Sequence, residues 1–363
     1  MPIIQHLGVF SSGAASPFED MSNFPNATRV GTTDVIYYGG SGSYTFTDPN
    51  GGASSYRFTV VGGGGATTGD GGGWYGVTGG GGGGCGRGTI QTSNSLTIEV
   101  AEGGASPGAL GITDQSINQT WAVGSASNGH NGINRVHGRG GVSSVKYGGT
   151  SLIYGTGGMP GLYGYYSTIN SSFFGWISAG FNGKNGGRGR WHNGGTGYAA
   201  SGGGVTVSSV FTENGGTGGC AAHQSSAALG LSAGDRHPRD GINIGGTGNT
   251  TGQQNQRGTT GEPTTLSGAG GGGGSNNDDS YGHPTASNIA GAAGGQSGLA
   301  SLLTGTGLTG SGGNGSNYGS NGTSATSGNA GGGHGGFGKD SIGDTWTRTF
   351  YGGEGIVVVE WLG

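Results

Sequence analysis

Hydrophobic residues alternate with polar ones near the two ends of the chain and are sparse between them. In residues 43–61 the apolar side chains recur at every second position around an Asp-Pro-Asn-Gly sequence typical of a turn. These apolar residues are Tyr44 and Phe46 before the turn, and Tyr56, Phe58 and Val60 after it. The alternation and the turn sequence together predict a β-hairpin.

Two further segments have the same character. Residues 89–104 predict another pair of short strands, with Leu96, Ile98 and Val100 on one face. Residues 355–361, GIVVVEW, are a β-rich run that suits a buried strand. We expect these strands to form one small sheet. Essentially no α-helix is expected, because no window of a dozen residues avoids glycine while keeping a 3.6-residue period.

Glycine dominates the rest of the chain. It accounts for 98 of the 363 residues and occurs in blocks such as 62–65, 79–84 and 270–274. Each glycine costs ~0.5–1 kcal/mol relative to alanine when it is ordered in a regular element. With 30% hydrophobic residues, the composition is also typical of disordered chains. An ordered chain of this kind needs backbone to pack directly on backbone.

Polyglycine II geometry provides such packing. A helix with three residues per turn and a rise of about 3.1 Å points every N–H and C=O outward, so that glycine-rich helices can approach and bond laterally. Collagen is excluded because glycine must then occupy every third position, whereas triplet spacing occurs here only briefly, as at 307, 310 and 313. No fixed solenoid or propeller period is present. The fold expected is therefore irregular and glycine-rich: a polyglycine II bundle closed by the small β-sheet.

Charge and cysteine content exclude other classes. Lysine and arginine total 14 against 18 acidic residues, a net charge of −4, which does not provide the basic patch that nucleic-acid binding needs. Cys85 and Cys220 cannot form a disulfide framework for a chain of this size. No signal-peptide pattern and no run of 18 apolar residues is present. We therefore expect no membrane insertion.

Matches to catalytic and metal-binding motifs do not indicate an active site or a metal site in this sequence. The pattern GxSxG occurs around Ser106 and Ser232, but it is expected by chance in so glycine-rich a chain. The segment 333–340 resembles a phosphate-binding loop, yet Asp340 stands where serine or threonine would bind magnesium. The eight histidines are scattered, without HExxH or CxxC patterns. We therefore expect no enzymatic activity, no cofactor and no metal.

The order of the glycine blocks and strands resembles a known family. FTVVGGGG, then GGGGGGCGRG, a distal GGGHGGFG and a closing GIVVVEW are similar to the glycine-rich domain of phage tail-fibre proteins, in particular the tip adhesins of T-even-type long tail fibres. The resemblance covers approximately residues 43–363. It implies a polyglycine II sandwich that displays loops at its far end, where they bind a host surface receptor. In that family a larger fibre-attachment domain precedes the glycine-rich part, whereas about 42 residues do so here.

Four regions follow from these patterns. They are an extended N-terminal docking arm (1–42), β-hairpins with the first glycine blocks (43–104), a polyglycine II bundle with receptor-facing loops (105–354) and a closing strand (355–363). The arm is expected to dock on a fibre shaft or another virion protein, or alternatively to fold back on its own sheet. The predicted docking residues are Ile3, Ile4, Leu7, Val9, Phe10 and Phe18.

Candidate receptor-binding residues lie in the loops between glycine blocks. An aromatic cluster either binds a receptor or fills gaps between helix layers: Tyr163, Tyr165, Tyr166, Phe173, Phe174 and Trp176. Cations flank an aromatic residue in a second loop and could meet acidic sugars or phosphates: Arg188, Arg190, Trp191 and His192. Two further polar loops, each either a receptor contact or a solvated turn, supply Arg236, His237, Arg239 and Tyr281.

Together with these patterns, the resemblance implies a non-enzymatic adhesin at the tip of a phage tail fibre, assembled in the host cytoplasm and then exposed extracellularly, with a bacterial outer-membrane protein or polysaccharide as receptor. One alternative is a virion decoration or fibre-cap protein without a specific receptor. An ice-binding or extracellular-matrix protein is less favoured, because ice binding requires short, uniform connections between its helices and the loops here are long and irregular.

Overall fold

The computed structural model describes residues 15–67, 79–106, 108–110, 132–135, 137–161, 205–216, 218–219, 255–256, 260–272, 276–277, 293–315, 326–336 and 349–363. Regular structure in these ranges is β-strand, with short 3-10 helices and no α-helix. The 3-10 helices are η1 (Pro17–Glu19), η2 (Met21–Asn23), η3 (Gly108–Leu110) and η6 (Gly298–Ser301). The expected lack of α-helix is confirmed for this part of the chain.

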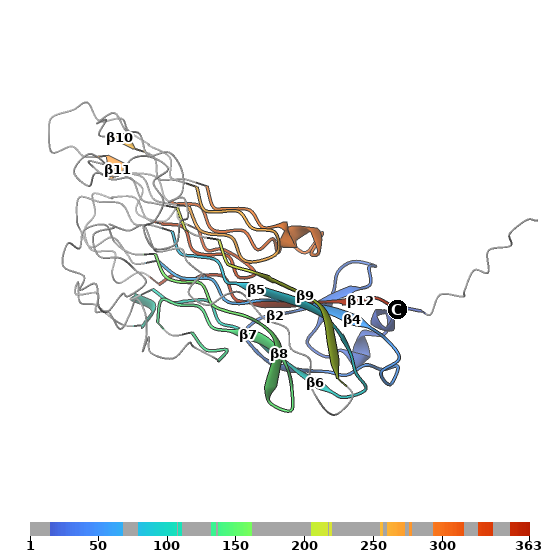
Figure 1. Ribbon diagram of the computed structural model, residues 1–363. Coiled ribbons are helices and arrows are strands. Elements are labelled where there is room, and N and C mark those ends of the chain that lie inside the picture. Colours follow the sequence, from blue (N-terminus) through green and yellow to red (C-terminus); the bar gives the residue numbers. More distant parts are fainter. Residues whose placement is uncertain are drawn as a thin grey trace, which may run out of the picture.

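The larger sheet has six antiparallel strands with the C-terminal strand near its middle (Figure 1). In spatial order they are β1 (Thr28–Arg29), β2 (Val35–Gly39), β12 (Ile356–Trp361), β4 (Tyr56–Val61), β5 (Cys85–Gln91) and β9 (Thr206–Glu213). The first four residues of β12 are buried, as expected of a closing strand that is bonded on both edges.

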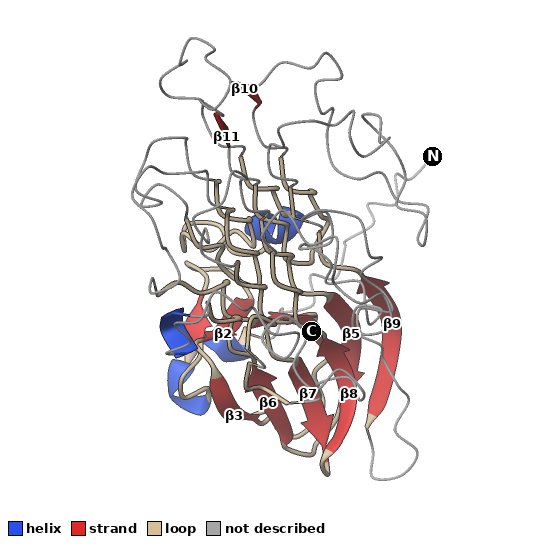
Figure 2. Cartoon of the chain, turned by 90° about the vertical axis from the view of Figure 1, so that its left-hand side faces the viewer, coloured by secondary structure: helices blue, strands red, loops and turns tan. Residues whose placement is uncertain are grey.

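The second sheet has four antiparallel strands. In spatial order they are β3 (Gly42–Phe46), β6 (Leu96–Val100), β7 (Ser143–Tyr147) and β8 (Thr150–Gly155). A separate two-stranded pair consists of β10 (Asn255–Gln256) and β11 (Asn276–Asn277). Figure 2 shows the two main sheets gathered at one end of the molecule.

The predicted hairpin over residues 43–61 is wrong. β3 pairs with β6 in the four-stranded sheet, while β4 pairs with β12 and β5 in the six-stranded one. The Asp48 carboxylate accepts the backbone N–H of Asn50 at 2.9 Å and of Gly52 at 2.7 Å, and the Tyr56 hydroxyl at 2.7 Å. These bonds stabilise a corner that carries the chain from one sheet to the other, a geometry that hydrophobic alternation does not distinguish from a hairpin.

The strands predicted in residues 89–104 likewise belong to different sheets. β5 lies in the six-stranded sheet and β6 in the four-stranded one, so two sheets replace the single small sheet expected. The predicted face of Leu96, Ile98 and Val100 is confirmed, because all three side chains are buried. A strand's buried face is encoded in its own alternation, whereas its partner depends on distant residues.

The main hydrophobic core lies between the two sheets. Phe58, Val60, Val357 and Val359 from the larger sheet belong to one buried cluster with Ile98 and the other inward-facing residues of the smaller sheet. Aromatic rings extend this cluster at the strand ends, with Phe46 5.3 Å from Phe58 between ring centroids. The alternating pattern at the two ends of the sequence therefore builds one shared core.

The part of the predicted docking arm that is described, residues 15–42, is integrated into the fold. β1 and β2 lie at the edge of the six-stranded sheet. Phe18, a predicted docking residue, is fully buried and stacks edge-on against Phe24 with ring centroids 5.0 Å apart. Its side chain is therefore not available to another protein, and residues 15–42 follow the alternative in which the segment packs on its own sheet.

A second apolar cluster covers the other face of the six-stranded sheet. Cys85, Ile356 and Val358 pack there with Leu299 and Leu303 from the turn around η6. Burial raises the pKa of the Cys85 thiol, so this cysteine stays protonated as a small core residue.

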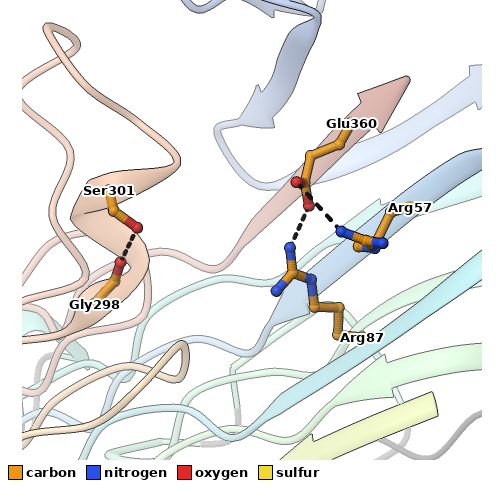
Figure 3. Close-up of polar contacts among 5 residues, drawn as sticks. All are labelled: Arg57, Arg87, Gly298, Ser301 and Glu360. Carbon is orange, nitrogen blue, oxygen red and sulfur yellow. Dashed lines mark hydrogen bonds and ion pairs between the residues drawn. The ribbon is translucent and has the colours of Figure 1, made fainter. Parts of the chain in front are cut away.

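Charged residues occupy neighbouring strands of the six-stranded sheet. Glu360 on β12 forms ion pairs with Arg87 on β5 at 2.6 Å and with Arg57 on β4 at 3.9 Å (Figure 3). The same figure shows η6, where the Ser301 hydroxyl donates to the Gly298 carbonyl at 2.8 Å. The ion pairs are partly exposed, so their contribution to stability is small compared with that of the core.

A matched pair of valines tests the position of the core. Val359→Ala removes two methyl groups from a fully buried site and should lower the free energy of unfolding by about 2 to 3 kcal/mol. Val210→Ala, at a site 46% exposed on β9, should change it by about 0.5 kcal/mol or less. Urea unfolding of the two variants measures the difference, and equal effects would contradict the core described above.

Candidate functional site

The strands of both sheets continue directly into glycine-rich segments. β4 leads into residues 62–67, residues 79–84 lead into β5, and residues 349–355 lead into β12. Figures 1 and 2 show these extended segments running side by side away from the sheets. The sheets thereby fix where each segment begins.

Hydrogen bonds of residues 62–66 rotate among neighbouring segments with a period of three residues. Successive N–H groups donate to residues 79–84, then 137–142, then 349–355, and the order repeats. The donor and acceptor pairs, at 2.7–3.1 Å, are Gly62 to Gly84, Gly63 to Gly141, Gly64 to Gly353, Gly65 to Gly81 and Ala66 to Gly138. The carbonyls of 63–66 accept from other segments, through the N–H groups of Gly158, Gly104, His334 and Gly161. This segment is therefore surrounded by backbone on all sides.

Residues 79–84 repeat the same rotation independently. Their N–H groups donate in turn to the segments 214–219, 331–336 and 156–161, and the cycle then recurs. The pairs, at 2.7–3.1 Å, are Gly79 to Gly219, Gly80 to His334, Gly81 to Met159, Gly82 to Gly216, Gly83 to Gly331 and Gly84 to Thr156. In both of these adjacent segments, the hydrogen-bonded neighbour therefore recurs at every third residue.

Close approach of the segments explains the glycine blocks. A Cβ atom added at Gly82 would collide with the carbonyl oxygen of Gly268, and one at Gly65 with that of Met159. The obstructing atoms belong to hydrogen-bonded backbone, which cannot turn aside as a flexible side chain can. Glycine is required here by the distance between segments.

The segments meet again at the end opposite the sheets, which we call the distal end. It is defined by hydrogen-bonded pairs of segment ends: Gly79 with Gly219, Gly219 with Gly271, Gly336 with Gly272, Gly272 with Gly313, and Ser106 with Phe350. Thr67 and Gly161 form a parallel bridge there. Positions in the chain that are far apart are thereby brought together at one end.

All predicted receptor-binding residues lie outside the described residues, within 162–204, 220–254 and 278–292. The docking candidates Ile3, Ile4, Leu7, Val9 and Phe10 also lie outside them. The structure nevertheless describes where the chain leaves for two of these ranges. Gly161 precedes the first and Gly219 precedes the second, and both belong to the distal end.

His334 is a buried polar side chain near the distal end. The residue is 2% exposed, its ring lies 4.9 Å from the Phe350 ring between centroids, and its Nδ1 lies 2.6 Å from the Gly335 carbonyl oxygen. Burial lowers the pKa of His334 to about 4, so the imidazole is neutral at pH 7. The scattered histidines in the sequence carried no signal for this packing role.

An exposed aromatic group lies on the flank of the distal end. Tyr351 is 40% exposed, its backbone pairs with Ala105, and the Arg135 guanidinium lies 4.8 Å from the centre of its ring. Glu102 accepts hydrogen bonds from the Arg135 backbone N–H at 2.9 Å and from its Nε at 3.0 Å. We call Tyr351, Arg135 and Glu102 the Tyr351 patch.

The hydrogen bonds from Arg135 hold the pKa of Glu102 below its usual range, so this pair is charged at neutral pH. The sequence did not indicate the patch, because its members are isolated along the chain. They meet only through the register of the glycine-rich segments around them.

Other chemistry is limited in the part of the chain that is described. Arg139 is 4% exposed, burial lowers its pKa to about 10, and its Nε has no hydrogen-bond partner among the described residues. Within the same ranges, no three His, Cys, Asp or Glu residues are grouped as a metal site would require. No helix among these residues is long and apolar enough to span a bilayer.

The sequence matches no protein-family model, and no curated protein matches it.

Substitution of a single glycine within the hydrogen-bonded segments tests how closely these segments approach one another. Gly82→Ala should lower the free energy of unfolding by about 3 kcal/mol, the upper part of the range for overpacking, because the new methyl group meets fixed backbone. Gly39→Ala is the matched control, since its methyl group would meet only the Tyr37 ring at 3.3 Å. Denaturant unfolding measures both, and an equally small loss would contradict the required role of Gly82.

Burial of His334 predicts a pH dependence of stability. Its pKa is lower in the folded chain, so between about pH 6.5 and 4 the unfolded chain binds more protons and stability falls as pH falls. The loss should be on the order of 3 kcal/mol. His334→Phe, which retains an aromatic ring beside Phe350, should lack this loss. Urea unfolding from pH 7 to 4 compares the two proteins, and parallel curves would contradict the assignment.

Proposed function

We propose that the glycine-rich segments form a polyglycine II bundle. The three-residue rotation of hydrogen bonds in 62–66 and again in 79–84 supports this geometry, since a polyglycine II helix has three residues per turn. The required glycines at Gly65 and Gly82 support it as well, because bare backbone permits lateral contact between helices.

The function best supported is that of a non-enzymatic receptor-binding protein at the tip of a phage tail fibre. The observation that carries this proposal is that the described part of the molecule has two different ends. The sheets lie at one end, and the segments that lead into the predicted receptor-binding ranges end at the other, with Gly161 and Gly219 as their last described residues. Such a molecule can be held by one end while the other meets a bacterial surface.

Recognition in this proposal needs no covalent chemistry and no cofactor. Aromatic and charged side chains of the predicted ranges would supply contact area and hydrogen bonds to a bacterial outer-membrane protein or polysaccharide. Several fibres on each particle would raise the avidity of weak individual contacts. The bundle contributes a rigid support, because its stability resides in backbone hydrogen bonds that side-chain changes in the loops leave intact.

Attachment to the particle is assigned to the opposite end. The C-terminal strand β12 lies inside the six-stranded sheet, and the last residue, Gly363, accepts a hydrogen bond from Ser55 at 2.9 Å. We propose that residues 1–14, with Ile3, Ile4, Leu7, Val9 and Phe10, dock on the fibre shaft or another virion protein. Within the arm first predicted for residues 1–42, Phe18 is assigned to the core instead.

Alanine substitution in the predicted ranges tests the proposal. Tyr165→Ala, Phe174→Ala and Trp191→Ala together should reduce particle adsorption to host cells at least about tenfold, as expected for loss of aromatic contacts. Normal assembly, checked by the amount of the protein in purified particles, is the control. Unchanged adsorption with normal assembly would contradict these receptor contacts, and loss of assembly would instead favour the packing role.

A further inference from the structure

We propose that the Tyr351 patch binds one neutral hexose unit of a bacterial surface polysaccharide. The assignment rests on the proposed receptor-binding function and names a ligand class for it. It places a contact on described residues at the flank of the distal end, outside the loops predicted from the sequence.

Tyr351 provides the apolar part of the site. Its backbone is fixed by the bridge to Ala105, and the preceding residue, Phe350, accepts a hydrogen bond from the Ser106 N–H at 3.0 Å. The Arg135 guanidinium lies over one face of the ring, 4.8 Å from the ring centre, and leaves the other face for a ligand. The residue is 40% exposed, and a tyrosine ring offers contact area at a low entropic cost, which suits the C–H surface of a sugar ring.

Arg135 and Glu102 provide the polar part. Arg135 uses its backbone N–H and Nε to hold Oε2 of Glu102, and its Nη1 and Nη2 donors have no hydrogen-bond partner among the described residues. Oε1 of Glu102 is likewise without one there. Both side chains are about one quarter exposed, with values of 26% and 28%. The patch thus presents donors and an acceptor together, next to an apolar ring.

A hexose matches this combination. Its adjacent hydroxyl groups each donate and accept hydrogen bonds, and its ring C–H groups form an apolar surface beside them. Because Glu102 neutralises Arg135, the patch carries no excess positive charge to favour a uronic acid or a phosphorylated sugar. The ligand class is therefore a neutral hexose.

The test measures binding of the purified full chain to host cells and to an array of bacterial O-antigen and capsular polysaccharides. The unaltered chain should bind cells and at least one array glycan built from neutral hexoses. Tyr351→Ala and Arg135→Gln should each weaken binding to that glycan about tenfold, while Tyr351→Phe should retain it. Phe211→Ala is the matched control, since Phe211 is also 40% exposed but lies on the sheet strand β9. Thermal unfolding checks that each variant is folded.

The outcomes separate this inference from the proposed function. If the chain fails to bind cells at all, the receptor-binding function is overturned, and the inference with it. If it binds cells but no neutral-hexose glycan, or if Tyr351→Ala and Arg135→Gln both remain folded and bind as well as the Phe211→Ala control, the inference is overturned while the function stands. Binding confined to anionic glycans, or binding to cells stripped of polysaccharide, also overturns it. The experiment supports the inference when neutral-hexose binding is lost in both patch variants and kept in Tyr351→Phe.

Discussion

The structure depends on one interaction, the backbone hydrogen bond between glycine-rich segments. Each such bond contributes little on its own, about 0.5–1.5 kcal/mol net, and ordering glycine is costly. What makes the arrangement stable is that N–H groups of 62–66 and of 79–84 donate to a carbonyl on a neighbouring segment, while most of the carbonyls in these two segments accept from other segments. Buried backbone is thereby satisfied without a conventional core in this part of the chain.

The two sheets determine the register of those hydrogen bonds, that is, which residues of neighbouring segments are paired. A glycine segment has no side chains that identify its neighbours, so its position must be set elsewhere. The strands β4, β5 and β12 are locked by a well-packed core that includes Phe58 and Val359, and each continues into or out of a glycine segment. Side-chain packing at one end therefore specifies backbone pairing along the rest of the molecule.

This division explains what the sequence could predict. The alternation of Leu96, Ile98 and Val100 predicted a buried strand face, and GIVVVEW predicted the closing strand, because these properties are local. The pairing partners of the strands are not encoded locally. The sequence of the corner stabilised by Asp48 resembled a hairpin turn, and the strands of two sheets were predicted to form one. The Tyr351 patch was missed for the same reason. Arg135 and Tyr351 are far apart in sequence, and they meet only because the glycine-rich segments that carry them are hydrogen-bonded in a particular register. The predicted loop residues stay predictions.

The three-residue rotation of hydrogen bonds also constrains how such a chain can change its length. Inserting one residue within 62–66 would turn every later N–H by a third of a revolution and direct it toward the wrong neighbour. Inserting three would restore the directions but move the segment's end outward by about 9 Å. A change of length beyond the segment ends, as after Gly161 or Gly219, would leave this bonding pattern intact. The backbone geometry of the described segments thus sets a length in units of three residues, which the segment ends do not share.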